Sequence, residues 1–300
     1  MAVLEPDHST SSRDPLREAL HGMWSSAAGS WTQHASFVDA RGEPVTTAML
    51  DLASPLTGKR VLELACGPGG VGLAASARVG PGGQVVLSDV AVEMVAAAAA
   101  RADRLGLSNV VARVLDLEHV DEPDAAFDVV LCREGLMLVP EPVIAAREIH
   151  RVLAPGGRAA IAVWGPRDRN PWLGALLDAV SSRTGAPVPP PGIPGPFSLD
   201  AVDTVAGVLE RAGFTDVEVH EVAVPFVCGS FYEWWTVVPS LAGPIARVLA
   251  ALPAEVVDAV RTQAREALVP FATTPGYTIP GLSLVAAARR GSPRVASGHL

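Results

Sequence analysis

The chain of 300 residues could form one large domain or two small ones, and its apolar residues, 49% of the total, can fill a substantial core. Its 23 basic and 32 acidic residues give a formal charge of −9 and no basic stripe that could follow a phosphate backbone. Nucleic acid is therefore not expected as a partner.

The cysteines and the apolar stretches bear on where the protein works. Cys66, Cys132 and Cys228 are widely spaced and form no C-x-x-C pair, which argues against a disulfide framework or a zinc site. The N-terminal residues are acidic and polar where a signal peptide needs positive charge and then an apolar run. The most apolar later stretch, 237–257, is interrupted by three prolines and an arginine, so no stable membrane insertion is expected. These features predict a cytoplasmic protein.

The first half of the chain begins with two distinct segments and then becomes regular. Residues 1–17 are expected to form a disordered leader, and residues 18–57 an N-terminal helical lid segment. Strands are then predicted at 60–65, 84–89, 110–115, 127–132 and 158–164, separated by helices at 70–79, 92–105 and 141–153. This alternation predicts a mostly parallel sheet with helices on both faces.

The second half is less regular. A proline-rich break at 187–196 cannot lie inside a helix or a central strand. A helix is predicted at 200–212 and strands at 215–227 and 282–289, and the two strands lie about fifty residues apart, too far for a hairpin loop. We therefore expect one core domain, which consists of residues 58–228 and 281–290, with a cap insertion at 229–280 and a tail at 291–300.

One strand–helix–strand unit carries a ligand-binding pattern. Gly67, Gly69 and Gly72 follow the first strand with G-x-G-x-x-G spacing, and Asp89 ends the second strand about 20 residues later. Glycines let the backbone approach a ligand closely, and a carboxylate at this place can accept hydrogen bonds from both hydroxyls of a ribose. The pattern fits two cofactors that contain adenosine, a nicotinamide dinucleotide and S-adenosylmethionine.

Three features favour S-adenosylmethionine. Glu63, near the end of the first strand, does not suit a pyrophosphate but tolerates a cationic, amine-bearing ligand. Asp116 and Leu117 end the third strand, where an acid can bind the adenine amino group while a leucine packs on the ring. Lys59 is the only lysine and precedes the first strand, so neither the Tyr-x-x-x-Lys pair of many short-chain dehydrogenases nor a P-loop can be assembled.

Four stretches in order resemble the motifs of class I S-adenosylmethionine-dependent methyltransferases, in particular the small-molecule group that includes ubiquinone and menaquinone methyltransferases. The stretches are VLELACGPGG, VVLSDVAVEM, VLDLEHVDEPDAAFDVVLCREGLMLVPEP and EIHRVLAPGGRAAIAVW. The resemblance covers about residues 58–165. It implies an α/β fold with a Rossmann-like, doubly wound, seven-stranded sheet whose last strand is antiparallel, here 215–227 paired with 282–289, plus a helical cap.

Carried over position by position, the resemblance assigns the matching residues to parts of the cofactor. The assignments are Gly67 and Gly69 along the methionine portion, Asp89 on the ribose, Val90 and Met94 beside the adenine, Asp116 and Leu117 at its edge, and Cys132 and Arg133 on the far side. One departure is Ala91, where the family often has a Ser or Thr that caps the next helix. Ser88 or Asp89 would have to compensate for it.

Methyl transfer needs mainly alignment of the acceptor, the methyl group and the sulfur in a dry pocket, because the sulfonium already makes the methyl carbon electrophilic. An acceptor hydroxyl also needs a base. The candidates are His34 in the N-terminal segment, Glu134 after the fourth strand and Tyr232 in the insertion, and His34 is the first choice. No metal is expected, because the acidic set of the metal-assisted catechol enzymes is not evident.

Aromatic residues outside the cofactor motifs are expected to bind the acceptor. Trp234 and Trp235 lie in the insertion and Trp31 in the N-terminal segment, and six tryptophans against two tyrosines favour apolar walls. The sequence thus predicts methylation, at oxygen rather than carbon, of an apolar small molecule such as a polyketide or quinone; a homodimer is compatible with it. Two alternatives stay open: a nicotinamide-dependent oxidoreductase, and an enzyme that keeps the cofactor but catalyses another reaction such as a cyclisation.

Overall fold

The main sheet of the protein has seven strands in the order β3-β2-β1-β4-β5-β10-β6. The computed structural model describes residues 14–54, 56–243 and 245–292. The strands of this sheet are β1 (Arg60–Glu63), β2 (Gln84–Asp89), β3 (Val110–Val114), β4 (Phe127–Arg133), β5 (Leu153–Trp164), β6 (Thr215–Ala223) and β10 (Leu282–Arg289). The last strand, β10, is antiparallel to both of its neighbours, and the other pairs are parallel. The predicted fold class is confirmed.

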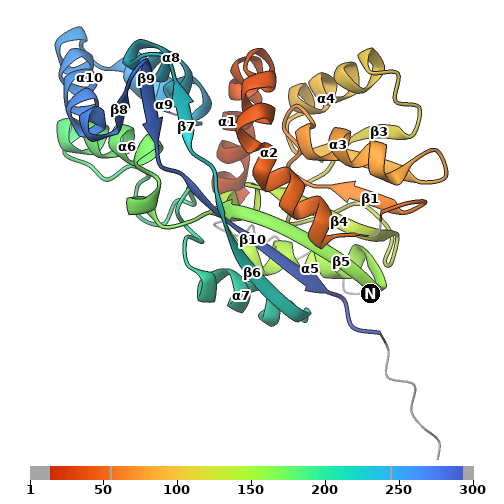
Figure 1. The fold of residues 1–300 in the computed structure, drawn as a ribbon. Helices are drawn as coiled ribbons and strands as arrows, with labels where there is room; N and C mark the ends of the chain where they lie inside the picture. Colours follow the sequence, from red (N-terminus) through yellow and green to blue (C-terminus); the bar gives the residue numbers. More distant parts are fainter. Residues whose placement is uncertain (1–13, 55, 244, 293–300) are drawn as a thin grey trace, which may run out of the picture.

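Helices cover both faces of this sheet (Figure 1). One face packs against α2 (Ala35–Leu52), α3 (Gly70–Val79) and α4 (Val92–Arg104), and the other against α5 (Pro142–Val152) and α7 (Val202–Arg211). The long helix α1 (Asp14–Gln33) contacts α4 and α8 (Phe231–Leu241). A short 3-10 helix, η1 (Leu136–Leu138), follows β4.

A second lobe stands beside the sheet (Figure 1). Its helices are α6 (Pro171–Thr184), α8, α9 (Ile245–Ala251) and α10 (Ala254–Leu268), with the 3-10 helices η2 (Arg167–Arg169) and η3 (Val269–Phe271). A small sheet in the order β7-β9-β8 completes it, from β7 (Phe226–Cys228), β8 (Ala272–Thr273) and β9 (Gly276–Ile279). Since α6 packs against α10, the lobe draws on residues before β6 as well as on the predicted insertion.

Several predicted boundaries are wrong. Helix α1 already begins at Asp14, so residues 14–17 are helical rather than part of a leader; residues 1–13 lie outside the described residues. The strand predicted at 215–227 ends at Ala223, and β7 after it pairs with β9 in the other sheet. Pro225, which has no amide hydrogen for a ladder, separates the two strands. The predicted tail at 291–300 falls mostly on 293–300, which the structure does not describe.

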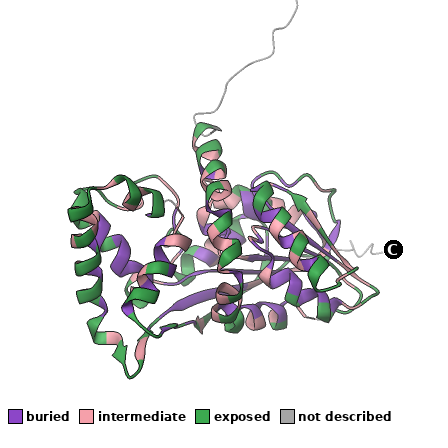
Figure 2. Ribbon diagram, turned by 90° about the horizontal axis from the view of Figure 1, so that it is seen from above, coloured by how far each residue is buried: buried purple, intermediate pink, exposed green. Residues whose placement is uncertain are grey.

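The apolar sequence runs explain which strands are central. Val61 and Leu62 in β1, and Val85 and Leu87 in β2, are fully buried because helices or neighbouring strands cover them on every side. The edge strands β3 and β6 instead leave most of their residues half-buried or exposed. Figure 2 shows the same pattern, with buried residues gathered in the sheet and exposed residues on the outer sides of the helices.

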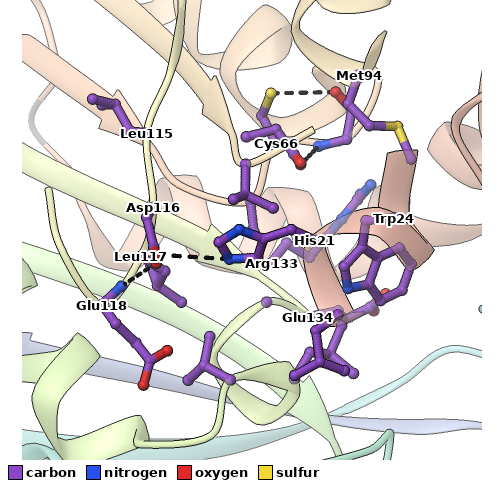
Figure 3. Close-up of a pocket in the computed structure, with 18 of the residues that line it drawn as sticks. His21, Trp24, Cys66, Met94, Leu115, Asp116, Leu117, Glu118, Arg133 and Glu134 are labelled. Atoms are coloured by element: carbon purple, nitrogen blue, oxygen red, sulfur yellow. Dashed lines mark hydrogen bonds and ion pairs between the residues drawn. The ribbon is translucent and has the colours of Figure 1, made fainter. Parts of the chain in front are cut away.

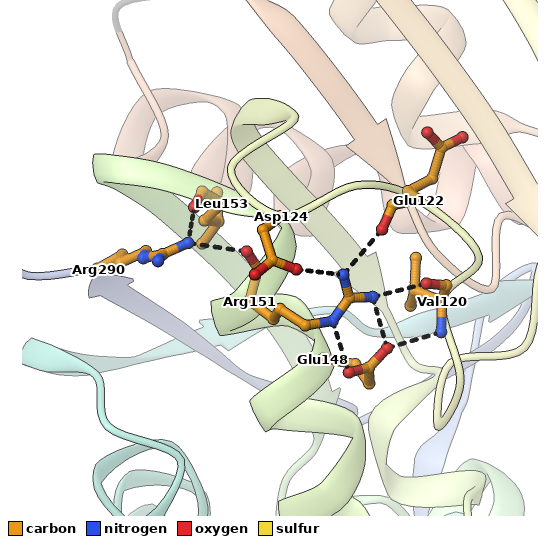
Figure 4. A network of polar contacts seen from close by, with 7 residues as sticks. All are labelled: Val120, Glu122, Asp124, Glu148, Arg151, Leu153 and Arg290. Atoms are coloured by element: carbon orange, nitrogen blue, oxygen red, sulfur yellow. Dashed lines mark hydrogen bonds and ion pairs between the residues drawn. The ribbon is translucent and has the colours of Figure 1, made fainter.

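A polar network fixes the loop between β3 and β4 to the end of α5 (Figure 4). The guanidinium of Arg151 donates hydrogen bonds of 2.8 Å to the carboxylates of Glu148 and Asp124. It also donates to the carbonyl oxygens of Val120 at 2.6 Å and Glu122 at 2.8 Å. None of these five residues lines the cavity described below, so the network holds the loop in place without taking part in the site.

Gly72, in the first turn of α3, is expected to be sensitive to any added side chain. A Cβ there would lie 2.6 Å from Glu63 Oε2 and would clash with the side chain of Leu87. Gly72→Ala should therefore lower the free energy of unfolding by about 1–3 kcal/mol. Gly207, inside α7, has nothing within 4 Å of such an atom. Gly207→Ala should raise stability by about 0.5–1 kcal/mol. Urea unfolding of both variants tests the difference, and equal effects would contradict it.

Candidate active site

A cavity opens where the first four strands end. Its walls come from the segments after β1, β2, β3 and β4, beside the point at which the order of parallel strands reverses. One face of α1 covers it. Of the predicted cofactor residues, eight line this cavity: Glu63, Gly67, Asp89, Val90, Met94, Asp116, Leu117 and Arg133. Gly69 and Cys132 do not.

The loop after β1 explains the glycine spacing. Gly67 and Gly69 have positive φ angles of 52° and 91°, which favour glycine. Gly67 lies on the cavity wall. A Cβ on Gly69 would instead come within 3.1 Å of Ala98 and Leu87, so this glycine serves the turn and its packing on α4 and β2. Gly69, predicted to lie along the methionine portion of the cofactor, is therefore not part of the cavity wall.

Asp89 ties together two parts of the wall. Its Oδ2 accepts a hydrogen bond from the amide of Gly67 at 2.9 Å, and its Oδ1 accepts one from the amide of Ala91 at 3.0 Å. The second bond holds the residue that precedes α4, but no side chain accepts a hydrogen bond from the first turn of this helix, so neither Ser88 nor Asp89 replaces the missing cap. Burial raises the pKa of Asp89, although these amide hydrogen bonds oppose the shift. Each carboxylate oxygen has a further acceptor position, so the group can still bind hydroxyls.

Glu63 is the most deeply buried acid on the wall, with 2% exposure. Its Oε2 accepts a hydrogen bond of 2.7 Å from the amide of Gly72. Burial raises the pKa of Glu63 to about 7, against the opposing charge of Arg133. A cationic ligand in the cavity would favour the ionised form, which agrees with the sulfonium- and amine-bearing cofactor that this acid predicts.

At the far end of the cavity, α1 meets the segment after β3 (Figure 3). Asp116 Oδ2 lies 3.7 Å from both Arg17 Nε and His21 Nε2, and Arg17 also donates to Glu118 at 3.2 Å. These contacts bring Arg17 and His21 of α1 beside the predicted adenine position. The segment thus closes this end of the cavity.

The sequence did not predict most of the α1 residues that line the cavity, which are Arg17, Leu20, His21 and Trp24. Together with Trp31 they recur at intervals of three, four and seven residues, the spacing of one helical face. This helical spacing is the feature of the sequence from which the cavity-lining face of α1 can be recognised. The leader predicted at residues 1–17 overlaps the first turn of this helix, which begins at Asp14.

The segment after β4 supplies Arg133 and Glu134. Arg133 donates a hydrogen bond of 2.8 Å to Thr46 Oγ1 on α2. Cys132, predicted on the far side of the cofactor, is fully buried in the core, and burial raises the pKa of its thiol to about 12. It lies outside the cavity because side chains on a strand alternate between the two faces of the sheet.

Glu134 has the features of a reactive carboxylate. Its φ of 61° is unusual for a residue with a side chain, and such strain concentrates at functional sites. Its amide donates a 2.7 Å hydrogen bond to Ala162 O, which anchors this backbone to β5. The side chain lines the cavity, and no hydrogen bond or ion pair to it is found among the described residues. Burial raises the pKa of Glu134, although Arg133 and Arg41 oppose the shift.

The other proposed catalytic and acceptor residues lie elsewhere, apart from Trp31. His34 stands half-buried at the junction of α1 and α2, outside the cavity. Tyr232 is 78% exposed on α8. Trp234 is fully buried in the second lobe, where its Nε1 donates to Trp172 O at 2.9 Å. Trp235 packs beside it, so the two cap tryptophans pack within the lobe instead of facing the cavity.

Two negative findings apply to the described part of the chain. No group of three or more His, Cys, Asp and Glu side chains there is placed to hold a metal ion. Among the helices described, none combines the length and apolar character needed to cross a bilayer.

The cavity lies at the switch point of a Rossmann-like sheet, and it is lined by an acid that can accept hydrogen bonds from a ribose. Such a site is typical of a protein that binds an adenosine-containing cofactor. Residues 56–177 match the family model of a methyltransferase domain. The chain is 37% identical to nocamycin O-methyltransferase from Saccharothrix syringae, over 62% of this chain and 72% of that protein. It is 33% identical to a demethylmenaquinone methyltransferase from Thermus thermophilus, over 54% and 80%. The chain therefore belongs to the S-adenosylmethionine-dependent methyltransferases.

Solved structures agree on the fold. The cyclase SpnF superposes with a TM-score of 0.52 at 22% identity, over 83% of this chain and 80% of that chain. At this identity the likeness concerns the fold alone. The residues in the cavity fit S-adenosylmethionine: Asp89 for the ribose, Asp116 at the adenine end, and the buried acid Glu63 towards a cationic group.

Proposed function

We propose that the protein methylates an oxygen atom of an apolar small molecule and that Glu134 takes the proton from that oxygen. The observation that carries this proposal is the carboxylate of Glu134 on the cavity wall, buried enough to have a raised pKa and without a hydrogen bond or ion pair among the described residues. The sequence favours His34 as the base. We assign this role to Glu134 instead, because of the three predicted candidates only Glu134 lines the cavity.

The bound cofactor supplies an electrophilic methyl group and a thioether leaving group. The protein's part is to hold the acceptor oxygen in line with them and to receive its proton on a carboxylate oxygen of Glu134. The O–CH3 bond forms as the S–CH3 bond breaks, and the bonding electron pair remains on sulfur. A base with a raised pKa is well matched to this task, because it accepts protons more readily near neutral pH than an ordinary carboxylate.

The chemistry of the nearby wall supports an apolar acceptor. Leu138, Val139 and Pro140 follow Glu134 along the cavity, and Trp24 and Trp31 face it from α1. In this proposal α1, rather than the cap, supplies the aromatic wall for the acceptor. The relative from Saccharothrix syringae is named as an O-methyltransferase, which also favours oxygen as the acceptor atom.

The proposal predicts release of S-adenosylhomocysteine together with an O-methylated product. Hydroxylated naphthoquinones, polycyclic phenols and apolar carboxylic acids would be incubated with the enzyme and cofactor labelled with ¹³C in the methyl group. The carbon chemical shift of the product distinguishes a methyl on oxygen from one on carbon. A C-methylated product, as relatives named as ubiquinone/menaquinone biosynthesis C-methyltransferases would suggest, would reject the oxygen assignment. Conversion of a substrate without S-adenosylhomocysteine release would reject methyl transfer itself.

A further inference from the structure

A buried carboxylate joins two walls of the cavity that lie far apart in the chain. Glu118, which follows β3, lines the cavity, and its side chain is only 1% exposed (Figure 3). Its Oε2 accepts a hydrogen bond of 3.2 Å from Arg17 Nε on α1, and its Oε1 accepts one of 2.9 Å from the amide of Glu141. Burying a charge is costly unless it is paired, and these two donors account for the burial of this one.

One of the two segments that Glu118 holds belongs to the proposed acceptor wall. Leu138, Val139 and Pro140 line the cavity immediately before Glu141. Residues 139–141 lie between η1 and α5 and belong to neither helix, so no regular backbone ladder fixes them. The bond from the Glu141 amide to the carboxylate therefore anchors the end of this wall.

The other segment is α1, which covers the cavity. His21 and Trp24 line the cavity from this helix, so a ligand that fills it contacts α1. The helix packs on α4 through a small apolar cluster around Ala28 and Met94, which is separate from the main core. Elements with few buried apolar contacts open most readily. A bound ligand should therefore favour the closed position of α1.

We infer that Glu118 is a positioning residue, whose carboxylate ties the closure of α1 over the cofactor to the placement of residues 138–141. The inference rests on the proposed function in taking this segment as the acceptor wall. A ligand that steadies α1 holds Arg17 in place, Arg17 holds the carboxylate, and the carboxylate holds the amide of Glu141. Binding of the cofactor thereby orders the wall that the acceptor meets.

Hydrogen–deuterium exchange with and without saturating S-adenosylhomocysteine tests this link. No acceptor is needed, so failure of the proposed methylation does not affect the result. In the wild type, the ligand should slow exchange in residues 138–141 about tenfold. In Glu118→Gln it should slow exchange there by less than twofold while still protecting the loop after β1. A glutamine has one acceptor oxygen, so it cannot serve Arg17 and Glu141 from opposite ends, and one of the two bonds is lost.

Two substitutions on α1 complete the comparison. Arg17→Met breaks the link from its other end and should remove the protection of residues 138–141 as Glu118→Gln does. Glu18→Gln is the matched control, because it changes the exposed neighbour of Arg17 on the same helix. This control should show the protection of the wild type.

Unchanged protection of residues 138–141 in either folded variant would overturn the inference, because the ligand would then hold the segment directly. A wild type in which S-adenosylhomocysteine leaves exchange of this segment unchanged would overturn it as well. Melting without ligand shows whether each variant folds. If Glu118→Gln does not, Arg17→Met decides, since the side chain of Arg17 is 31% exposed and its replacement leaves the core intact.

Discussion

Glu134→Gln is expected to lower kcat for the O-methylated acceptor by about 100- to 1,000-fold, the usual contribution of a well-placed general base. The amide is nearly the same size but cannot take the proton. S-adenosylhomocysteine affinity should stay within threefold, because the substitution leaves Asp89 and the loop after β1 intact. Steady-state kinetics with calorimetry on the same preparation measures both quantities.

The pH dependence gives a second readout for Glu134. A base must be ionised to act, so the rate should rise as pH increases through the pKa of Glu134. Because burial raises that pKa, the acid limb should lie above the pH at which an ordinary glutamate titrates. The limb should flatten in Glu134→Gln. Glu63, whose pKa is about 7, also titrates in the cavity, but it would act through the pH dependence of cofactor binding.

Two further variants test whether the base is Glu134 or a residue elsewhere in the chain. Glu93→Gln changes an exposed glutamate on α4 and should leave kcat unchanged. His34→Ala removes the imidazole that the sequence favoured as the base. If Glu134→Gln retains kcat within threefold while His34→Ala loses it, the assignment from the cavity is wrong and the base lies at the junction of α1 and α2.

Asp89→Ala is expected to weaken S-adenosylhomocysteine binding by about 2–4 kcal/mol, or roughly 30- to 1,000-fold. The substitution removes the acceptor for the ribose hydroxyls. It also releases the amides of Gly67 and Ala91, so the glycine loop and the start of α4 lose the bonds that hold them together. Calorimetry measures the affinity, and thermal unfolding without ligand measures the structural part.

Asp89→Asn divides these two contributions. Its one amide oxygen can keep a single backbone bond, but the charge that strengthens the ribose bonds is gone. Its melting temperature should be closer to that of the wild type than that of Asp89→Ala, while its affinity stays low. Binding of S-adenosylhomocysteine within threefold of wild type by Asp89→Ala would show that the ribose is held elsewhere.

The sequence by itself determined the sheet and one wall of the site. Parallel strands buried on both faces require continuous apolar runs, and these runs are legible at Val61–Leu62 and Val85–Leu87. The predicted cofactor residues are also local: Gly67 and Asp89 lie at strand ends, and parallel strands bring those ends to one edge of the sheet. Gly69 and Cys132 share the same motifs yet miss the cavity, because the direction of each turn or side chain depends on packing.

Only the tertiary structure decided what covers that wall. Trp31 and Trp234 are equally plausible pocket residues in a linear sequence, but α1 lies over the cavity while Trp234 is buried between helices of the second lobe. Glu134 is preferred over His34 as the proposed base for the same reason: only the packing of the chain shows which of the two lines the cavity. Whether a titratable side chain faces a cavity depends on contacts between segments far apart in the chain, since α1 must pack against α4 and the loops after the strands before the cavity exists. The spacing of side chains in the sequence shows which of them share one face of a helix. Only the packing of that helix in the folded protein decides what the face contacts.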